Sequence, residues 1–290
     1  MGAIYAFATM AGSTGKTTSA VTLGVQLARA GYRTRIIDLD SQANASMWLG
    51  YEDTHGKTVA DILRQDATIA DVELPGRVVN GETEDGEPLL GEIDNLTLIP
   101  ARRATLDKVM IELAASTGGV LRLREALAQA EPVDVTLIDC PGTMSTLVVA
   151  GMLATTAAED NPDPKSWGVI ACTQPALKGT LGLPDLEDQI ADLRRTYRVP
   201  LDLLAIVPCV VPSAGAGNVY IEQMADLRDA YTTKVTRGVR RAAIVDEAFA
   251  MSTPLPLAGY RAKSVVQDYD DVRQDLEGLG LFANLPARVG

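Results

Sequence analysis

Residues 3–18 read Ala-Ile-Tyr-Ala-Phe-Ala-Thr-Met-Ala-Gly-Ser-Thr-Gly-Lys-Thr-Thr, and this stretch decides the fold. Its first six residues are apolar and predict a short buried strand, while Ser19 to Ala30 carry apolar residues at helical spacing until Gly31. Residues 33–40 predict the next strand. The result is one strand–loop–helix–strand unit with a glycine loop at the helix N-terminus, where unpaired amides and the helix dipole favour an anion.

The side chains of this loop indicate which anion binds. Gly12 and Gly15 let the backbone approach phosphates, Lys16 can reach the β- and γ-phosphates, and the Thr17 hydroxyl can ligate Mg²⁺. A glycine loop before a helix is common, but Gly-Lys-Thr-Thr directly after an apolar strand is much rarer, so we expect ATP and Mg²⁺ as cofactors. The loop residues expected to bind the nucleotide are Gly12, Ser13, Thr14, Gly15, Lys16, Thr17 and Thr18.

Two further carboxylates are expected beside the loop. Residues 133–139 predict a buried parallel strand that ends in Asp139, which can act on Mg²⁺ together with Thr17. A solvated acid at a strand end is the alternative for Asp139. Asp40 is expected to position the attacking water, so Lys16 and Asp40 are the catalytic candidates, whereas Asp38 is equally compatible with a structural role.

Composition limits the class of protein. The chain has 290 residues and 47% hydrophobic content, which suits one large α/β domain over residues 1–290. We expect no signal peptide and no membrane span, and three cysteines beside apolar strands predict reduced core thiols and a cytoplasmic protein. The net charge of −12 argues against indiscriminate nucleic-acid binding unless the bases are gathered in one place.

Strands alternate with helices along the rest of the chain, which predicts a doubly wound, mostly parallel sheet flanked by helices on both faces. The acidic residues 76–94 are expected at the surface, as a hairpin or as a solvated loop. Further strands are predicted at 96–100, 167–173 and 201–208. Helices are predicted at 45–49, 58–64, 104–130 with a break near 117–119, 179–197, 219–231 and 265–276.

The loop resembles the deviant Walker A motif, Lys-Gly-Gly-x-Gly-Lys-Thr, of the ParA/MinD family of dimeric P-loop ATPases. Residues 38–46 are similar to the Asp-x-Asp-Pro-Gln-x-Asn signature of that family, and residues 139–141 resemble the start of its Asp-Cys-Pro-Pro switch. A looser match at residues 241–248 is similar to a late signature. The resemblance implies an ATP-bound homodimer, with the adenine base at Pro208 and the loop that follows it.

This chain departs from the family pattern at the position of the signature lysine, where it has Ala11. The resemblance to carboxysome-distributing relatives, which also lack this lysine, implies a replacement from a later helix. Lys178 is our candidate for that catalytic role, because it follows the strand at 167–173 and emerges at the phosphate edge. A solvated residue at a helix start is the alternative for Lys178.

The resemblance implies a cargo-positioning switch that binds nucleoid DNA non-specifically and is stimulated by a ParB-like or cargo-adaptor protein. A membrane-cycling switch of the MinD kind is disfavoured, because residues 277–290 contain three glycines, a proline and a single base. A metabolic ligase of the dethiobiotin-synthetase type remains the alternative from another class.

DNA contact is expected on a basic stretch in an otherwise acidic chain, because a local excess of bases releases counterions from phosphates. An ordinary solvated face with salt bridges is the alternative. The candidate residues are Lys234, Arg237, Arg240, Arg241, Arg261 and Lys263.

Overall fold

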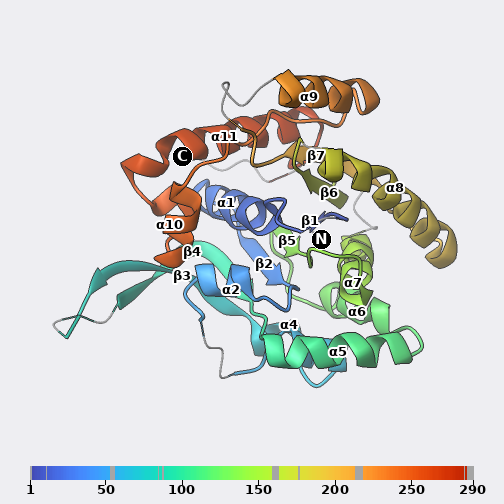
Figure 1. Ribbon diagram of the computed structural model, residues 1–290. Coiled ribbons are helices and arrows are strands. Elements are labelled where there is room, and N and C mark those ends of the chain that lie inside the picture. The colour runs from blue at the N-terminus through green and yellow to red at the C-terminus, as the bar shows by residue number, and fades with distance from the viewer. Residues whose placement is uncertain are drawn as a thin grey trace.

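The computed structural model describes residues 2–10, 12–52, 56–83, 85–86, 88–158, 163–175, 177–212, 218–283 and 285, and only the backbone of residues 177–181 and 218. Its strands form one seven-stranded sheet in the order β3-β4-β2-β5-β1-β6-β7 (Figure 1). All neighbouring strands are parallel except β3 and β4. The strands are β1 Ala3–Ala8, β2 Thr34–Asp38, β3 Leu74–Glu82, β4 Pro88–Ile99, β5 Val135–Asp139, β6 Trp167–Thr173 and β7 Leu203–Pro208.

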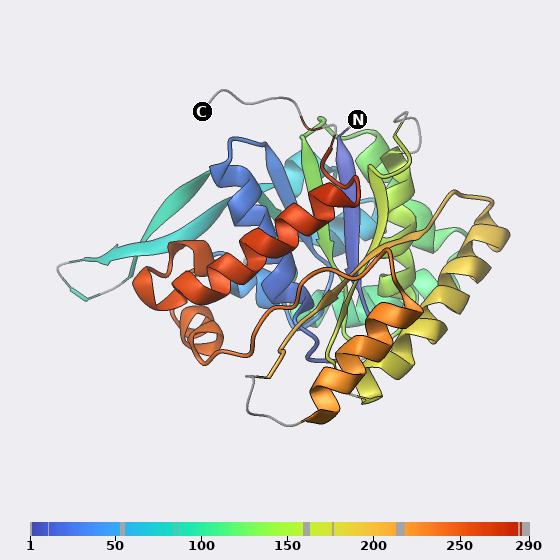
Figure 2. The ribbon, with the colours of Figure 1, turned by 90° about the horizontal axis from the view of Figure 1, so that it is seen from above.

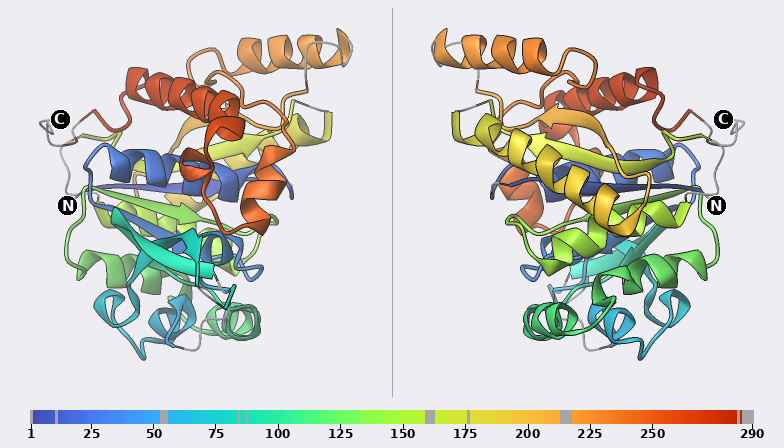
Figure 3. Two further views of the ribbon diagram at one scale, coloured as in Figure 1. Left: turned by 90° about the vertical axis from the view of Figure 1, so that its left-hand side faces the viewer. Right: turned by 90° about the vertical axis from the view of Figure 1, so that its right-hand side faces the viewer.

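Helices cover both faces of this sheet, as the edge-on views in Figure 3 show. In β1, Ile4 and Ala6 pack in the core with the helices from α3 to α8, while Tyr5 and Phe7 pack with α1, α2, α10 and α11. This alternation follows from the two-residue period of a strand, and it makes β1 apolar on both faces. The α-helices are α1 Lys16–Arg29, α2 Asn44–Trp48, α3 Val59–Arg64, α4 Ile69–Val72, α5 Arg103–Ala115, α6 Arg122–Ala128, α7 Thr146–Thr155, α8 Leu177–Tyr197, α9 Asn218–Ala230, α10 Ile244–Ala250 and α11 Lys263–Gly278.

The predicted doubly wound architecture is confirmed, with local differences. The helix expected over residues 104–130 is two helices, α5 and α6, because Gly118 has φ +73° and a short 3₁₀ turn follows it. The sequence reasoning missed α7, whose residues are apolar on all sides and carry no helical period. It also missed α10, which lies within the loosely matched residues 241–248.

The acidic residues 76–94 belong to the β3–β4 hairpin, one of the two structures we expected. The hairpin extends away from the body of the molecule (Figures 1 and 2). Its register is irregular on β3, between Pro75 and Arg77 and again between Val79 and Gly81. Asn95 adopts φ +61° just before β4 joins β2, so the strand changes direction where it leaves the hairpin and enters the sheet.

A buried ion pair ties this hairpin to the parallel sheet. The Arg35 side chain on β2 is 3% exposed, and its Nε lies 2.7 Å from Oε1 of Glu73, next to the first residue of β3. The Thr97 hydroxyl on β4 also donates to Glu73, at 2.6 Å. Such a pair contributes little net stability when intact, but loss of one partner leaves a buried charge without compensation.

Glu73→Ala is therefore expected to destabilise the fold by about 3 kcal/mol, because it leaves the Arg35 guanidinium buried without its carboxylate. Urea unfolding followed by circular dichroism measures the change. Asp192→Ala is the matched control, since its pair with Arg195 is exposed on both sides and exposed pairs contribute little. Equal stability of the two variants would contradict this account of the Arg35–Glu73 pair.

Candidate functional site

The glycine loop joins β1 to α1 at the carboxyl edge of the sheet. Gly15 is the residue before α1, with φ +83° and no side-chain cap on the helix. A Cβ on Gly15 would lie 2.9 Å from the Cβ of Cys209, so both the backbone conformation and the packing require glycine. The first amides of α1 are left without side-chain partners, which is the arrangement that binds phosphate.

This loop forms the floor of a cavity of about 690 Å³. Residues 12–18, all expected to bind nucleotide, line it, and so does Asp40. Lys16 is 6% exposed, so its ammonium group is held at the cavity rather than in bulk water. The sequence-predicted loop residues and Asp40 are therefore brought together in one hollow large enough for a ligand of nucleotide size.

Asp38 and Asp139 end two adjacent strands and are paired in the register of β2 and β5. Both are fully buried. Asp38 accepts hydrogen bonds from the Ser46 amide at 2.8 Å, the Ser46 hydroxyl at 2.7 Å and the Asp40 amide at 3.2 Å. Burial nevertheless raises the pKa of Asp38 to about 7, against the lowering effect of Ser46.

Neither carboxylate oxygen of Asp139 has a hydrogen-bond partner in the described part of the chain. Burial raises the pKa of Asp139 well above its ordinary value, and the negative charge of Asp38 raises it further. Thr17 and Lys16 act in the opposite direction and favour the ionised form. A buried carboxylate without a donor at the edge of a phosphate loop fits a cation that is not a protein group.

The residues present therefore fit Mg²⁺. The ion would be held by the Thr17 hydroxyl and by Asp139, directly or through water, with the remaining ligands from phosphates and solvent. No cluster of three or more His, Cys, Asp or Glu side chains suited to a metal occurs among the described residues. This agrees with a cation that takes few ligands from the protein.

Asp40 and Asp38 differ in their surroundings. Asp40 lines the cavity and accepts a hydrogen bond from the Gln42 amide at 2.9 Å. Asp38 does not line the cavity, and its carboxylate instead accepts hydrogen bonds from Ser46 of α2. The geometry thus favours a structural role for Asp38, which the sequence left open, and keeps Asp40 as the candidate for positioning water.

Several cavity residues were missed by the sequence reasoning. Asp107 on α5 and Asp246 on α10 add two carboxylates to the lining, and Trp48 and Phe249 pack edge to face with ring centroids 5.6 Å apart. No motif marks these residues, because they come from helices on opposite faces of the sheet. Of these residues, only Asp246 lies in a stretch that the sequence analysis had noted, the loose match to a family signature at residues 241–248.

The residue expected at the adenine base is not in the cavity. Pro208 is buried at the end of β7, where its carbonyl accepts from the Val239 amide at 2.8 Å. Val210, two residues further, lines the cavity instead and has φ +55°. The expected adenine loop continues through residues 213–217, which lie outside the described residues.

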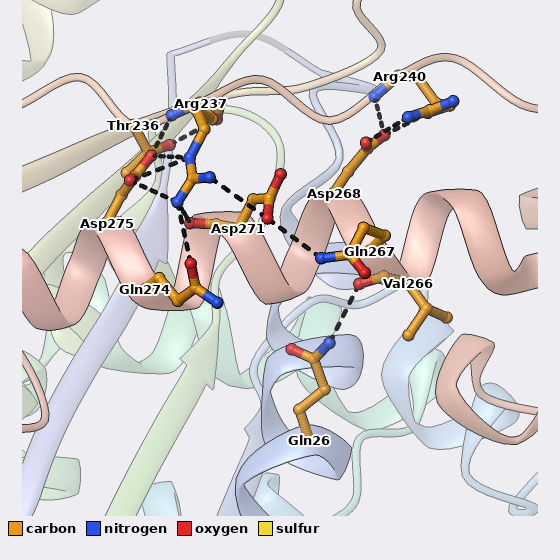
Figure 4. A network of polar contacts seen from close by, with 10 residues as sticks. All are labelled: Gln26, Thr236, Arg237, Arg240, Val266, Gln267, Asp268, Asp271, Gln274 and Asp275. Atoms are coloured by element: carbon orange, nitrogen blue, oxygen red, sulfur yellow. Dashed lines mark hydrogen bonds and ion pairs between the residues drawn. The ribbon is translucent and has the colours of Figure 1, made fainter.

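The expected DNA-binding residues fall into two groups. Arg237 pairs with Asp271 and Asp275, Arg240 pairs with Asp268, and Arg261 pairs with Glu247. Figure 4 shows Arg237 and Arg240, from the segment before α10, reaching aspartates on α11, and their own backbone amides also donate to Asp275 and Asp268.

The second group is Lys234, Arg241 and Lys263, which have no ion pair within the described residues. Arg241 and Lys263 are exposed, whereas Lys234 is half-buried. Three residues before Lys263, Tyr260 is 88% exposed. The salt-bridge alternative therefore describes the first group, and the second remains available to phosphates.

The structure describes only part of the two positions that bear on the signature lysine, Ala11 and its proposed replacement Lys178. Ala11 lies outside the described residues. Lys178 lies in the first turn of α8, but its side chain also falls outside them. In the described part of the chain, no helix is both long enough and apolar enough to span a bilayer.

This chain is similar to known proteins in its sequence and in its fold. A family model described as an AAA domain (AAA_31) matches residues 2–199. The chromosome partitioning protein ParA of Caulobacter vibrioides is 36% identical over 162 residues, which is 53% of this chain and 53% of that protein. The chromosome-partitioning ATPase Soj of Thermus thermophilus is 34% identical over 201 residues, covering 67% of this chain and 65% of that protein.

These alignments span about half to two thirds of the curated relatives. Among solved structures, Cyanothece McdA in its ATP complex superposes with a TM-score of 0.76 at 19% identity, covering 100% of this chain and 99% of that chain. At this identity the superposition shows a shared fold.

Replacing the unpartnered carboxylate tests this description of the site. Asp139→Asn is expected to stabilise the nucleotide-free protein at pH 8, because it removes a buried charge that no donor satisfies. The pKa of Asp139 is higher in the folded than in the unfolded chain, so stability falls as pH rises from about 4 through the folded-state value. The Asp139→Asn variant should not show this decrease in stability with rising pH.

Thermal unfolding of both proteins between pH 5 and pH 9, without Mg²⁺ or nucleotide, measures the difference. An Asp139→Asn variant that is less stable than wild type at pH 8 would contradict the assignment.

Proposed function

Because this chain belongs to the ParA/MinD family of P-loop ATPases, we propose that it is an ATP-dependent dimerising switch that positions a cargo on DNA. The cargo is a plasmid, a phage or chromosomal DNA region, or a protein compartment. One observation carries the catalytic part of the proposal. The phosphate loop and Lys16 line the cavity, and the unpartnered Asp139 ends β5 at the same edge of the sheet.

Each residue has a role that phosphoryl transfer requires. The amides of residues 12–18 and the Lys16 ammonium hold the β- and γ-phosphates, and Thr17 with Asp139 holds the metal ion. Bound Mg²⁺ supplies charge neutralisation between the phosphates. Asp40 lines the cavity and orients the water that attacks, a task in which positioning matters more than covalent chemistry.

A second copy of the chain is proposed to complete the site. Among the described residues that line the cavity, Lys16 is the one cation, against Asp40, Asp107 and Asp246. Two nucleotides facing each other in a dimer need more positive charge than this. We assign this additional positive charge to Lys178 of each subunit, at the start of α8. Ala11 occupies the position where the family has its signature lysine.

DNA and a partner protein complete the proposal. Non-specific DNA binding falls on Lys234, Arg241 and Lys263, since Arg237 and Arg240 are already neutralised by aspartates of α11. A ParB-like or adaptor protein on the cargo stimulates hydrolysis and releases the switch from nucleoid DNA in the cytoplasm.

The catalytic assignment predicts two different losses. Lys16→Ala should abolish ATP binding, because it removes the cation that contacts the phosphates. Asp40→Ala should retain ATP within about threefold and lose turnover by about a hundredfold, as expected for a group that acts on the water. Equilibrium binding of ATP and release of phosphate measure the two effects. Normal turnover in Asp40→Ala would remove this residue from the mechanism.

The DNA assignment predicts a difference between neighbouring arginines. The double variant Arg241→Ala/Lys263→Ala should weaken ATP-dependent DNA binding and reduce the slope of log K against log salt by about 2. Arg240→Ala should instead lower the melting temperature, because it leaves Asp268 without its partner.

The matched control is Arg194→Ala/Arg198→Ala, which changes the net charge equally; both residues are exposed, Arg194 in the last turn of α8 and Arg198 directly after the helix. If the control double variant reduces the salt slope as much as Arg241→Ala/Lys263→Ala does, DNA binding depends on net charge alone and the assignment is wrong.

A further inference from the structure

A side chain from outside the cavity holds the phosphate loop. The Nε2 of Gln174 donates a hydrogen bond to the Ser13 carbonyl at 2.6 Å, between residues 161 positions apart in the sequence. Ser13 and Thr14 line the cavity, whereas Gln174 does not. Gln174 therefore contacts the loop from its outer side.

The peptide that Gln174 holds is in a conformation that serine disfavours. Ser13 has φ +58°, in the left-handed region where a Cβ is unfavourable and where glycine is the usual residue. A non-glycine residue persists in this conformation only where its surroundings fix it. In the described part of the chain, the Gln174 amide is the one side chain that donates a hydrogen bond to the Ser13 carbonyl.

The orientation of this peptide decides what the loop offers to a phosphate. In a trans peptide the carbonyl and the following N–H point in opposite directions. Fixing the Ser13 carbonyl outward, toward Gln174, therefore directs the Thr14 N–H inward, toward the cavity. Thr14 itself is 2% exposed and its hydroxyl has no partner among the described residues, so the inner side of the loop is poised for a ligand.

Gln174 is well placed to act as a fixed support. It follows β6, which pairs with β1 up to Ala8 and so approaches the start of the phosphate loop. The carbonyl of Thr173, the residue before it, accepts from the Cys209 amide at 2.7 Å. Gly182 on α8 adds a second contact, since a Cβ there would lie 2.9 Å from the Cβ of Met10.

We propose that Gln174 is a positioning residue that holds the left-handed Ser13 peptide so that the Thr14 amide faces the phosphates. This inference rests on the proposed nucleotide binding and goes beyond it by naming what orients the loop. It also explains how the chain tolerates serine at a position where glycine would need no support.

The test is a double-mutant cycle between the two residues, with Gln174→Ala, Ser13→Gly and the combined variant. Gln174→Ala should weaken ATP·Mg²⁺ and ADP·Mg²⁺ binding by about tenfold, the loss of one well-oriented hydrogen bond. Ser13→Gly supplies the reference background of the cycle, since glycine adopts positive φ without help. In the Ser13→Gly background, Gln174→Ala should then cost about twofold or less.

Two further variants control for trivial effects. Gln174→Glu keeps the shape but replaces the donor with an acceptor, so it should weaken nucleotide binding more than alanine does. Gln267→Ala, on the exposed side of α11, removes a glutamine far along the chain from the loop and should leave affinity unchanged. The melting temperatures of the nucleotide-free variants should remain within about 2 °C of wild type, as a positioning role requires.

The outcomes separate the two proposals. Absence of ATP binding in the wild type would overturn the proposed function and this inference with it. Wild-type ATP binding that Gln174→Ala and Gln174→Glu leave unchanged would overturn the inference alone. A tenfold loss that persists in the Ser13→Gly background would also overturn it, because Gln174 would then act on something other than the strained peptide.

Discussion

Asp38 and Asp139 are buried next to each other at the ends of two adjacent parallel strands, facing the buried ammonium group of Lys16. Desolvation and mutual repulsion make this arrangement costly in the empty protein. Asp38 is stabilised by the backbone and hydroxyl of Ser46, whereas Asp139 has no comparable donors. The fold thus retains an unfavourable charge at the place where we propose that a cation binds.

The parallel sheet explains why these groups meet. In a doubly wound sheet the carboxyl ends of neighbouring strands lie at one edge, and β1 sits between β5 and β6 in the strand order. The phosphate loop after β1 is therefore flanked by the chain that leaves β5, with Asp139, and by the chain that leaves β6, with Gln174. One flank carries the carboxylate that we propose for the metal, and the other donates the hydrogen bond to the Ser13 carbonyl that we propose orients the loop.

The contacts of α11 reach two distant parts of the molecule. On one side, the Tyr269 hydroxyl lies 3.2 Å from the Ser19 hydroxyl of α1, beneath the phosphate loop. On the other side, Asp268 and Asp275 hold the backbone and side chains of Arg240 and Arg237 (Figure 4). Basic residues that look available for DNA in the sequence are thus partly used to anchor the C-terminal segment.

The sequence by itself determined the sheet class, most of the strands and helices, and the glycine loop between the first strand and the first helix. Each of these depends on local patterns: apolar runs, helical spacing, and glycines with lysine and threonine between a strand and a helix. The tertiary structure alone decided which carboxylate is structural, which arginines are ion-paired, and that Gln174 reaches Ser13. These facts depend on contacts between residues far apart in the chain, and periodicity carries no information about such distances.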